Sequence, residues 1–275
     1  MKCICHLACS KACECLPRRC EDLAHNVFNF VHGSDKRISQ LAVFQILLEV
    51  QVHAILRPAQ TRWLSLLAVV NRLLEQWQPL LLFFTDQWMA LRLNAAEAIY
   101  QELTNPFTKM FYHFLAYVFP KVVTFNSYFQ SESVVLTSLD EKMRKTFKEL
   151  LEVYMKRDYV ARTKLSEIQP NREDEFLPLE NMYFGVEVMK DLQKEEIFKN
   201  AIELTDFSVR CRAFMAKLCQ GVQDRYAFDD PLLSSIKLLA PQEALSVKTR
   251  GTVPSLVPLC ELVPRCKPDA RPSNT

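Results

Sequence analysis

Glycine is scarce in this sequence: only 4 of the 275 residues are glycine. Because glycine reaches positive backbone φ without steric cost, tight hairpins and β-rich folds use it heavily. Leucine, glutamate, lysine, glutamine and methionine are common instead, and apolar residues recur at spacings of three and four. Together these features predict a mainly α-helical protein.

The sequence also lacks a strong charge imbalance and a long apolar run. Its formal net charge is +2, so composition alone does not indicate a nucleic-acid binder. The run from Pro79 to Phe84 is too short to cross a bilayer, which predicts no membrane partner. With 49% hydrophobic and 24% charged residues, most of the chain should be globular.

Recognisable catalytic motifs are missing too. The sequence has no glycine-rich phosphate loop, no H-E-x-x-H and no G-x-S-x-G motif. Its 32 acidic residues include no pair that stands out as an acid–base couple. We therefore expect a protein that is not an enzyme, with no catalytic residues, no cofactor and no small-molecule substrate.

Of the 10 cysteines, six fall between Cys3 and Cys20. Residues 1–20 lack an apolar segment long enough for a secretory signal peptide, so we expect free thiols in a reducing, intracellular compartment. A zinc site is one interpretation, but Cys5, Cys9 and Cys13 are spaced like one face of a helix, not like paired C-x-x-C ligands. We favour buried helix-face thiols and expect no bound metal.

Three segments follow from the pattern of apolar residues and helix breakers. Residues 1–60 should hold two short helices and then a longer one over 37–56, which is apolar on nearly every side and should be covered all round. Pro58 ends that helix, because the residue before a proline avoids the α region. Residues 61–224 should form an α-helical domain. Residues 225–275, with seven of the 14 prolines, should be a loosely ordered tail.

Amphipathic stripes predict the helices of the second segment. The first stripe alternates gaps of four and three, which indicates a helix packed lengthwise on a partner, and Pro79 should kink it or start a new helix. Its residues are Trp63, Leu67, Val70, Leu74, Trp77, Leu81 and Phe84. Further helices are expected at 86–104, 106–130 (kinked or broken at Pro120), 139–157, 185–203 and 206–223. The face of 139–157 is Met143, Phe147, Leu150 and Tyr154, and that of 206–223 is Phe207, Cys211, Phe214, Leu218 and Val222.

The segment Thr61-Arg62-Trp63 allows two interpretations. Arginine can hold a phosphate and tryptophan can stack on a base, so Arg62 and Trp63 are candidate DNA-binding residues. Trp63 also starts the first apolar stripe, and a tryptophan in that position is commonly a core residue. The pattern alone favours the core.

Four segments, in this order, resemble the hAT (hobo/Activator) superfamily of DNA transposases, above all its domesticated vertebrate copies. The segments are Cys3-x-x-His6; Ser34-Asp-Lys-Arg37; Thr61-Arg-Trp-Leu-Ser65 continuing to Trp77; and Phe119-Pro-x4-Phe-Asn-x2-Phe-Gln-Ser-Glu132 followed by Tyr183-Phe-Gly185. Cys3 and His6 are then family-motif residues and not a zinc finger. The resemblance covers roughly residues 1–240.

The resemblance implies a partial ribonuclease-H-like fold. Residues 1–60 would be a remnant of the catalytic domain, holding only its helices, and 61–224 the α-helical insertion domain. In the family three acidic residues bind two divalent metals. Two of them lie upstream of the C-x-x-H helix, and the third follows the insertion in a pattern that this chain does not show. The tryptophan of the family's R-W pair handles an unstacked base, a role that would fall to Trp63 with Arg62 beside it.

The resulting expectation is a catalytically inactive, transposase-derived protein of the nucleus that acts through DNA or protein contacts. The alternative is a protein-interaction scaffold with no nucleic-acid role; a nuclease completed by upstream sequence is a third. If strands normally cover the helices of 1–60, part of their apolar surface is open here, and it should bind a protein partner or drive self-association. Residues 61–224 should then fold alone, whereas the full chain should be oligomeric or aggregate.

Overall fold

The computed structural model describes residues 4–58, 63–129 and 136–240, together with residues 245, 246, 251 and 260. Within these residues the only β pairing is an isolated bridge between Met155 and Phe176, so the prediction of a mainly helical protein is confirmed. The α-helices are α1 (Ile4–Cys13), α2 (Arg18–His32), α3 (Asp35–Leu47), α4 (Trp63–Glu75), α5 (Trp77–Thr85), α6 (Asn94–Thr104), α7 (Pro106–Phe129), α8 (Leu139–Leu151), α9 (Arg157–Arg162), α10 (Val186–Asp191), α11 (Glu195–Phe198), α12 (Ala201–Gln223) and α13 (Pro231–Ser235).

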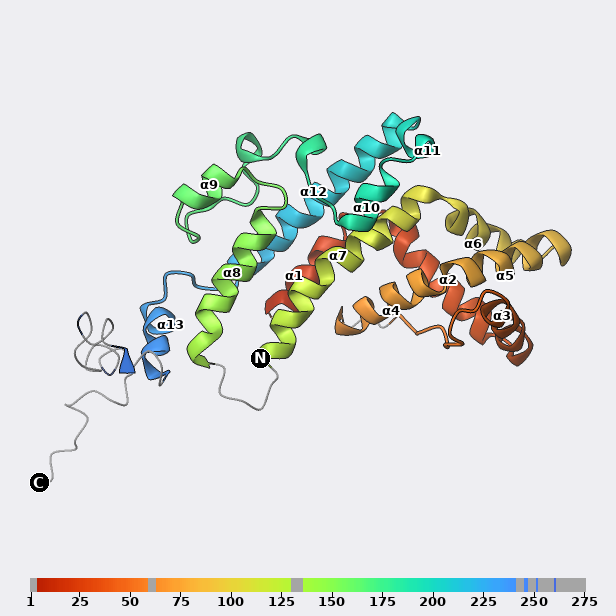
Figure 1. Ribbon diagram of the computed structural model, residues 1–275, viewed down its shortest axis with the longest axis horizontal. Helices are drawn as coiled ribbons and strands as arrows, with labels where there is room; N and C mark the ends of the chain where they lie inside the picture. Colours follow the sequence, from red (N-terminus) through yellow and green to blue (C-terminus); the bar gives the residue numbers. More distant parts are fainter. Residues whose placement is uncertain are drawn as a thin grey trace, which may run out of the picture.

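The two long helices, α7 and α12, form the middle of an elongated molecule together with α1 (Figure 1). Helices α2 to α6 lie at one end of it, and α8, α9 and α13 lie toward the other. None of the described helices is both long and apolar enough to cross a membrane.

Helices α1 and α12 approach each other closely at Gly221. A Cβ atom placed on Gly221 would lie 2.8 Å from the Cβ and 3.0 Å from the Cα of Ala8, closer than side chains normally come. Ala8 and Ala12 are fully buried on the opposing face of α1. The absence of side-chain atoms at Gly221 therefore allows the two backbones to come together.

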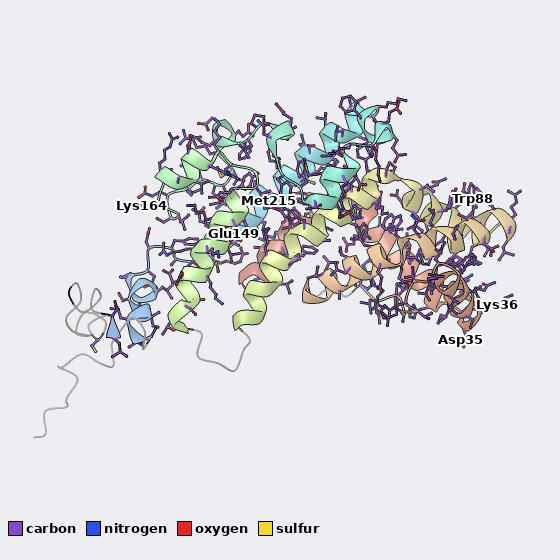
Figure 2. All side chains as sticks on the ribbon, viewed as in Figure 1. Asp35, Lys36, Trp88, Glu149, Lys164 and Met215 are labelled. Atoms are coloured by element: carbon purple, nitrogen blue, oxygen red, sulfur yellow. The ribbon has the colours of Figure 1, made fainter. Side chains whose placement is uncertain are left out.

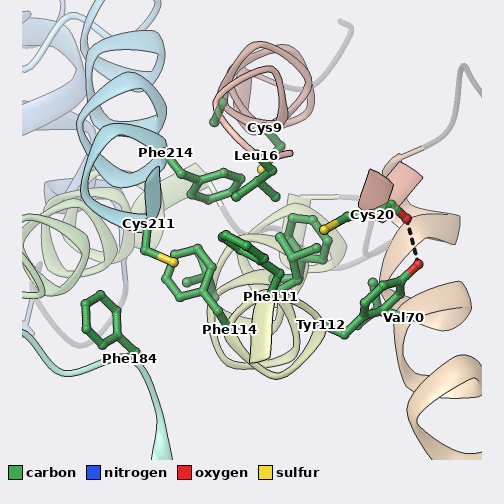
Figure 3. Close-up of a cluster of buried hydrophobic side chains, with 14 of the residues drawn as sticks. Cys9, Leu16, Cys20, Val70, Phe111, Tyr112, Phe114, Phe184, Cys211 and Phe214 are labelled. Carbon is green, nitrogen blue, oxygen red and sulfur yellow. Dashed lines mark hydrogen bonds between the residues drawn. The ribbon is translucent and has the colours of Figure 1, made fainter. Parts of the chain in front are cut away.

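One hydrophobic core connects these helices. The rings of Phe111 on α7 and Phe207 on α12 have centroids 4.8 Å apart, and those of Phe114 and Phe214 lie 5.4 Å apart. The Tyr112 hydroxyl donates to the backbone carbonyl of Cys20 over 2.7 Å, joining α7 to α2 (Figure 3). The core thus includes side chains from both sides of the predicted division at residue 60. That the part after this division folds alone stays a prediction.

The predicted helix over 37–56 is wrong in its second half. Helix α3 ends at Leu47, Glu49 takes a φ of 54°, and the Val50 N–H donates to the Gln45 carbonyl over 2.9 Å. Residues 50–58 are not helical, and side chains from neighbouring helices bind their backbone carbonyls. Those tertiary hydrogen bonds replace the helical ones, so the apolar composition of the segment did not reveal its conformation.

Gln45 and Gln76 hold α3 against the junction of α4 and α5. The Gln45 side-chain amide donates to the Gln76 side-chain oxygen over 2.8 Å and to the His53 carbonyl over 2.9 Å. Gln76 in turn donates to the Gln51 carbonyl over 3.0 Å. Gln45 and Gln76 are 2% and 0% exposed, so each buried amide is matched by partners from another segment.

The predicted first stripe is interrupted and shifted. A new helix does begin near Pro79, because Gln76 separates α4 from α5 and Pro79 falls in the first turn of α5, where a proline is tolerated. The buried residues are Val69, Val70, Leu73, Trp77, Leu80, Phe83 and Phe84. Leu67, Leu74 and Leu81 are only half-buried, because the face that packs on the neighbouring helices is rotated by about one residue from the predicted one.

The remaining helices differ from prediction mainly at their ends. The predicted 86–104 helix is a π-helical turn (Asp86–Ala90) followed by α6, and the predicted 185–203 helix is split into α10 and α11. Helix α7 is continuous through Pro120, so the predicted break is absent there. Helix α8 ends at Leu151 and α12 begins at Ala201, where the Asn200 side chain accepts the Glu203 N–H. Every residue named for the two predicted faces is buried, which confirms the faces of α8 and α12, although Tyr154 lies in the turn after α8.

Two further predictions, a loosely ordered tail over 225–275 and a ribonuclease-H-like remnant over 1–60, are tested only in part. In the predicted tail the described residues include α13 and a 3₁₀ turn (Ile236–Leu239), and most residues after 240 lie outside the described part. Residues 4–58 contain helices α1, α2 and α3 and no strand. The ribonuclease-H-like ancestry of this segment stays a prediction.

Replacing Gly221 by alanine tests the contact between α1 and α12. In an isolated helix this change is favourable, but here the added Cβ meets Ala8, so we expect the free energy of unfolding to fall by about 1–3 kcal/mol. Urea denaturation measures the change. Ala213→Ser, at an exposed position of the same helix, is the matched control and should alter stability by no more than about 0.5 kcal/mol. A Gly221→Ala variant that is as stable as the parent or more stable would contradict the packing described.

Candidate functional site

Two of the four predicted site residues, His6 and Trp63, lie on two helices that contact each other, α1 and α4. Trp63 is the first residue of α4, and its side chain lies outside the described part. Arg62 lies outside it altogether, as does Cys3. His6 belongs to α1, with its side chain likewise outside the description. The structure therefore brings together the helices that carry His6 and Trp63, and the DNA-binding role of Arg62 and Trp63 stays a prediction.

Helix α4 is positioned by polar contacts at its C-terminal half. The Arg72 guanidinium donates to the Ala54 carbonyl over 2.5 Å and forms an ion pair with Glu75 at 3.0 Å. Glu75 also accepts a 2.9 Å contact from the Nδ1 atom of His53. These groups fix segment 50–58 along α4. Because the Arg72 guanidinium contacts the Ala54 carbonyl and the Glu75 carboxylate, it is not free to bind a phosphate.

The start of α4 shares a helix face with core residues. Trp63 lies two helical turns before Val70, which is 1% exposed, and Trp77 opens the next helix after a further seven residues. Trp77 itself is buried, and its Nε1–H donates to the Leu103 carbonyl over 3.1 Å. The burial of Trp63 itself lies outside the description, so its interpretation as a core residue stays a prediction.

Four of the described cysteines are buried on helices that form the core. They are Cys9 on α1, Cys20 on α2 and Cys211 on α12, which are labelled in Figure 3, together with Cys219 on α12. Burial raises the pKa of the Cys20 thiol to about 12 and raises that of Cys13 well above its ordinary value. Such thiols are protonated at neutral pH, whereas metal binding and nucleophilic attack require the thiolate. Among the residues the structure describes, no three His, Cys, Asp or Glu side chains form a group that could hold a metal ion.

A buried charge cluster that sequence reasoning missed joins α7 to α10. Asp191, 7% exposed, accepts from the Nδ1 atom of His113 at 2.8 Å and from the Lys194 ammonium at 2.7 Å. Burial raises the pKa of the Asp191 carboxyl, but the hydrogen bonds from Lys194 and His113 outweigh it and hold the pKa below its usual value. His113 and Asp191 are 78 residues apart in sequence, so no local pattern links them. The cluster satisfies a buried carboxylate and ties the two helices together.

An exposed apolar surface is present on α3. Val43, Ile46 and Leu47 are 61%, 67% and 67% exposed, and we call these three residues the α3 stripe. They follow one another at helical spacing, while Leu41 and Gln45 on the same helix face the core. The prediction that this helix would be covered all round is therefore wrong for one side of it. This open side belongs to residues 1–60, the segment for which self-association or partner binding was predicted.

The interpretation of Trp63 can be tested against Trp77, whose burial is known. As a core residue, Trp63→Ala should lower the free energy of unfolding by about 3–5 kcal/mol, as Trp77→Ala should, and DNA affinity should change only through unfolding. If Trp63 instead stacks on a base, Trp63→Ala should leave the free energy of unfolding nearly unchanged and weaken binding to single-stranded or hairpin DNA by about 1–3 kcal/mol. We expect the first result. A stable Trp63→Ala variant with selective loss of DNA binding would reverse it.

The thiol assignment predicts slow alkylation of the native protein. At pH 8 the buried Cys20, Cys211 and Cys219 should react with iodoacetamide far more slowly than after unfolding in urea, because burial raises their pKa values above the ordinary thiol value and so lowers the fraction of reactive thiolate. All 10 thiols should react once the chain is unfolded, and the purified protein should carry no stoichiometric zinc. A single tightly held zinc ion that is lost on replacing Cys5 and Cys9 would contradict the assignment.

Comparisons of the chain with protein-family models, with curated proteins and with solved structures find no match. The likeness to hAT transposases accordingly rests on the four sequence segments alone and stays a prediction.

Proposed function

We propose that this protein is a catalytically inactive, transposase-derived protein of the nucleus that acts by binding other protein surfaces through the α3 stripe. The observation that carries the proposal is the exposure of Val43, Ile46 and Leu47 on adjacent turns of one helix. Leu48 and Val52, next along the chain, are also exposed and widen the apolar surface. A grouped apolar surface of this kind is typical of a protein contact site, whereas single exposed apolar residues are ordinary.

The gain from covering the stripe is large enough to support binding. Fully burying one aliphatic side chain of this size contributes about 1.5–3 kcal/mol, and the three side chains are each more than half exposed. The helix that presents them is itself fixed, because Leu41 is buried and Gln45 is tied to Gln76. A surface that does not need to be ordered on binding loses less conformational entropy.

A second exposed pair, Phe198 and Ile202, supports this assignment less well. Phe198 ends the short helix α11, and Ile202 lies at the start of α12. Charged side chains surround the pair, among them Glu195 and Lys199, which form an ion pair at 2.6 Å. Covering Phe198 and Ile202 would require those charges to be partly desolvated, which opposes binding.

The absence of nuclease activity is a further part of the proposal. It is supported by the sequence, whose acidic residues include no pair that stands out as an acid–base couple, and by the raised thiol pKa values, which disfavour cysteine nucleophiles. DNA contact through Arg62 and Trp63 belongs to the same proposal and rests on the resemblance alone. Binding to duplex and branched DNA across a salt series separates it from a pure scaffold role, because phosphate contacts produce a steep salt dependence.

Photo-crosslinking in cells tests the α3 stripe directly. A benzophenone amino acid in place of Ile46 should give a discrete crosslinked product on irradiation, because a partner surface lies against that position. The same amino acid in place of Ile202, which is 85% exposed, is the matched control and should give little or none. Absence of a product at position 46, or equal yields at both positions, would contradict the proposed contact surface.

A further inference from the structure

We propose that Tyr117 and Tyr183 form a binding site for the methylated ammonium group of a lysine side chain on a partner protein. The site is separate from the α3 stripe, so the inference goes beyond the proposed function and does not depend on it. Proteins bind methylated ammonium groups on aromatic rings, because the negative face of each ring attracts the cation. Three features of this region match that chemistry.

The first feature is the geometry of the two rings, which we call the tyrosine corner. Tyr117 lies on α7 and Tyr183 in the non-helical stretch before α10, and their ring centroids are 5.4 Å apart with 88° between the planes. Tyr117 is half-buried, whereas Tyr183 is 44% exposed and is the one exposed tyrosine among those the structure describes. Two perpendicular rings, one of them exposed, give a small cation two walls to contact.

The backbone holds the tyrosine corner in place without a ligand. Gly185 has a φ of 100°, and a Cβ atom there would lie 2.7 Å from both the Cβ and the Cγ atoms of Tyr117, so glycine lets the chain pass close to the ring. Met182 and Phe184, on either side of Tyr183, are each 2% exposed and anchor the stretch in the core. A site that does not need to be ordered on binding loses less conformational entropy.

The second feature is an ammonium group already present at the tyrosine corner. The Lys121 Nζ atom lies 5.0 Å from the centroid of the Tyr117 ring. Lys121 follows Tyr117 by about one helical turn on α7, so its side chain reaches the ring from within the same helix. The ring therefore contacts a cation in the unliganded protein, and an incoming ammonium group would displace Lys121 from it.

A methylated ammonium group competes well with the unmethylated group of Lys121. Methylation keeps the positive charge of a lysine but removes N–H donors, so the methylated group is less strongly hydrated and loses less on leaving water. The displaced Lys121 ammonium regains its own hydration. Val186, 59% exposed and directly after Gly185, adds apolar surface for the aliphatic stem of the incoming side chain.

The third feature is a carboxylate near the rings. Glu149 is exposed on α8, a helix that packs against α7 (Figure 2 labels Glu149). The pKa of the Tyr117 hydroxyl is raised, mainly by burial and further by Tyr183 and the Glu149 carboxylate. The same negative charge attracts a cationic ligand and repels an anionic one. It therefore favours a lysine side chain over a nucleic-acid phosphate at the tyrosine corner.

Titration of the full chain with three amino-acid derivatives tests the site. They are acetylated trimethyl-lysine amide, its unmethylated counterpart, and a neutral analogue with a tert-butyl group in place of the trimethylammonium group. Ligand-observed NMR should show that the trimethylated compound binds at least about threefold more tightly than the neutral analogue, the gain expected from a cation–π contact at an exposed site. The unmethylated compound should also bind more weakly, because its ammonium group is more strongly hydrated.

Variants then assign the binding to the tyrosine corner. Tyr183→Leu should weaken it by about threefold or more, whereas Tyr183→Phe, which keeps the ring face, should stay within about twofold of the parent. Lys121→Gln should strengthen binding by about two- to threefold, because the internal ammonium group no longer competes. Tyr100→Leu removes a half-buried tyrosine on α6 and is the matched control, with no change expected. Circular dichroism checks that each variant is folded.

Several results would overturn the inference. Equal affinity for the trimethylated compound and its neutral analogue would show that the charge is not recognised, and choline binding equally tightly would exclude selection of a lysine side chain. Weaker binding by Lys121→Gln, or binding of a single-stranded thymidine oligonucleotide that depends on Lys121 and Tyr183, would indicate a nucleic-acid contact instead. No binding by either the parent or Lys121→Gln would exclude the site. Crosslinking at position 46 tests the proposed function separately from all of these.

Discussion

The close approach of α1 and α12 at Gly221 is the constraint on which the rest of the structure depends. Because a Cβ atom at Gly221 would come within 2.8 Å of Ala8, the two helices can lie together only if this position is glycine or the backbones move apart. Their contact brings α12 within reach of the aromatic side chains of α7, where Phe111 meets Phe207 and Phe114 meets Phe214 (Figure 3 labels Phe111, Phe114 and Phe214). Most of the buried surface in the middle of the molecule is arranged around these three helices.

The arm formed by α2 to α6 follows from this centre and from a second, polar constraint. Tyr112 ties α7 to the start of α2, and buried glutamines then fix α3 along α5. Gln45 contacts Gln76 while Gln40 contacts Gln87, so α3 and α5 run antiparallel. Buried amides are sensitive to register because an unmatched one is unfavourable. By fixing which side of α3 faces inward, this network also fixes that Val43, Ile46 and Leu47 face outward.

The sequence was most informative where one helix face is buried and the other is solvated. The stripes of α8 and α12 were predicted correctly because Met143 to Leu150 and Phe207 to Val222 repeat at helical spacing. The end of α3 was missed, since it depends on Glu49 adopting a positive φ and on amides from distant segments binding the carbonyls of residues 50–58. The π-helical turn at Asp86–Ala90 likewise has no signal in the local apolar pattern.

The functional groups were less predictable than the fold. Arg62 and Trp63 were selected from a short motif whose chemistry suits both a core and a nucleic-acid contact, and sequence alone cannot separate the two. The His113–Asp191 pair required two helices to be placed in space first. The α3 stripe was hidden by its own composition, because a helix that is apolar nearly all round gives no indication of which side stays open.

The central claim is that α1, α7 and α12 form one cooperative core and not two adjoining units. Native-state hydrogen exchange at increasing denaturant tests it most directly, since amides that exchange only through global unfolding share one free energy and one denaturant dependence. The structure predicts that the slowest-exchanging amides of α1 show the same free energy and the same denaturant dependence of exchange as those of α7 and α12. If the α1 and α2 amides instead exchange through a separate opening of lower free energy while α7 and α12 remain protected, the core is divided and the account is wrong.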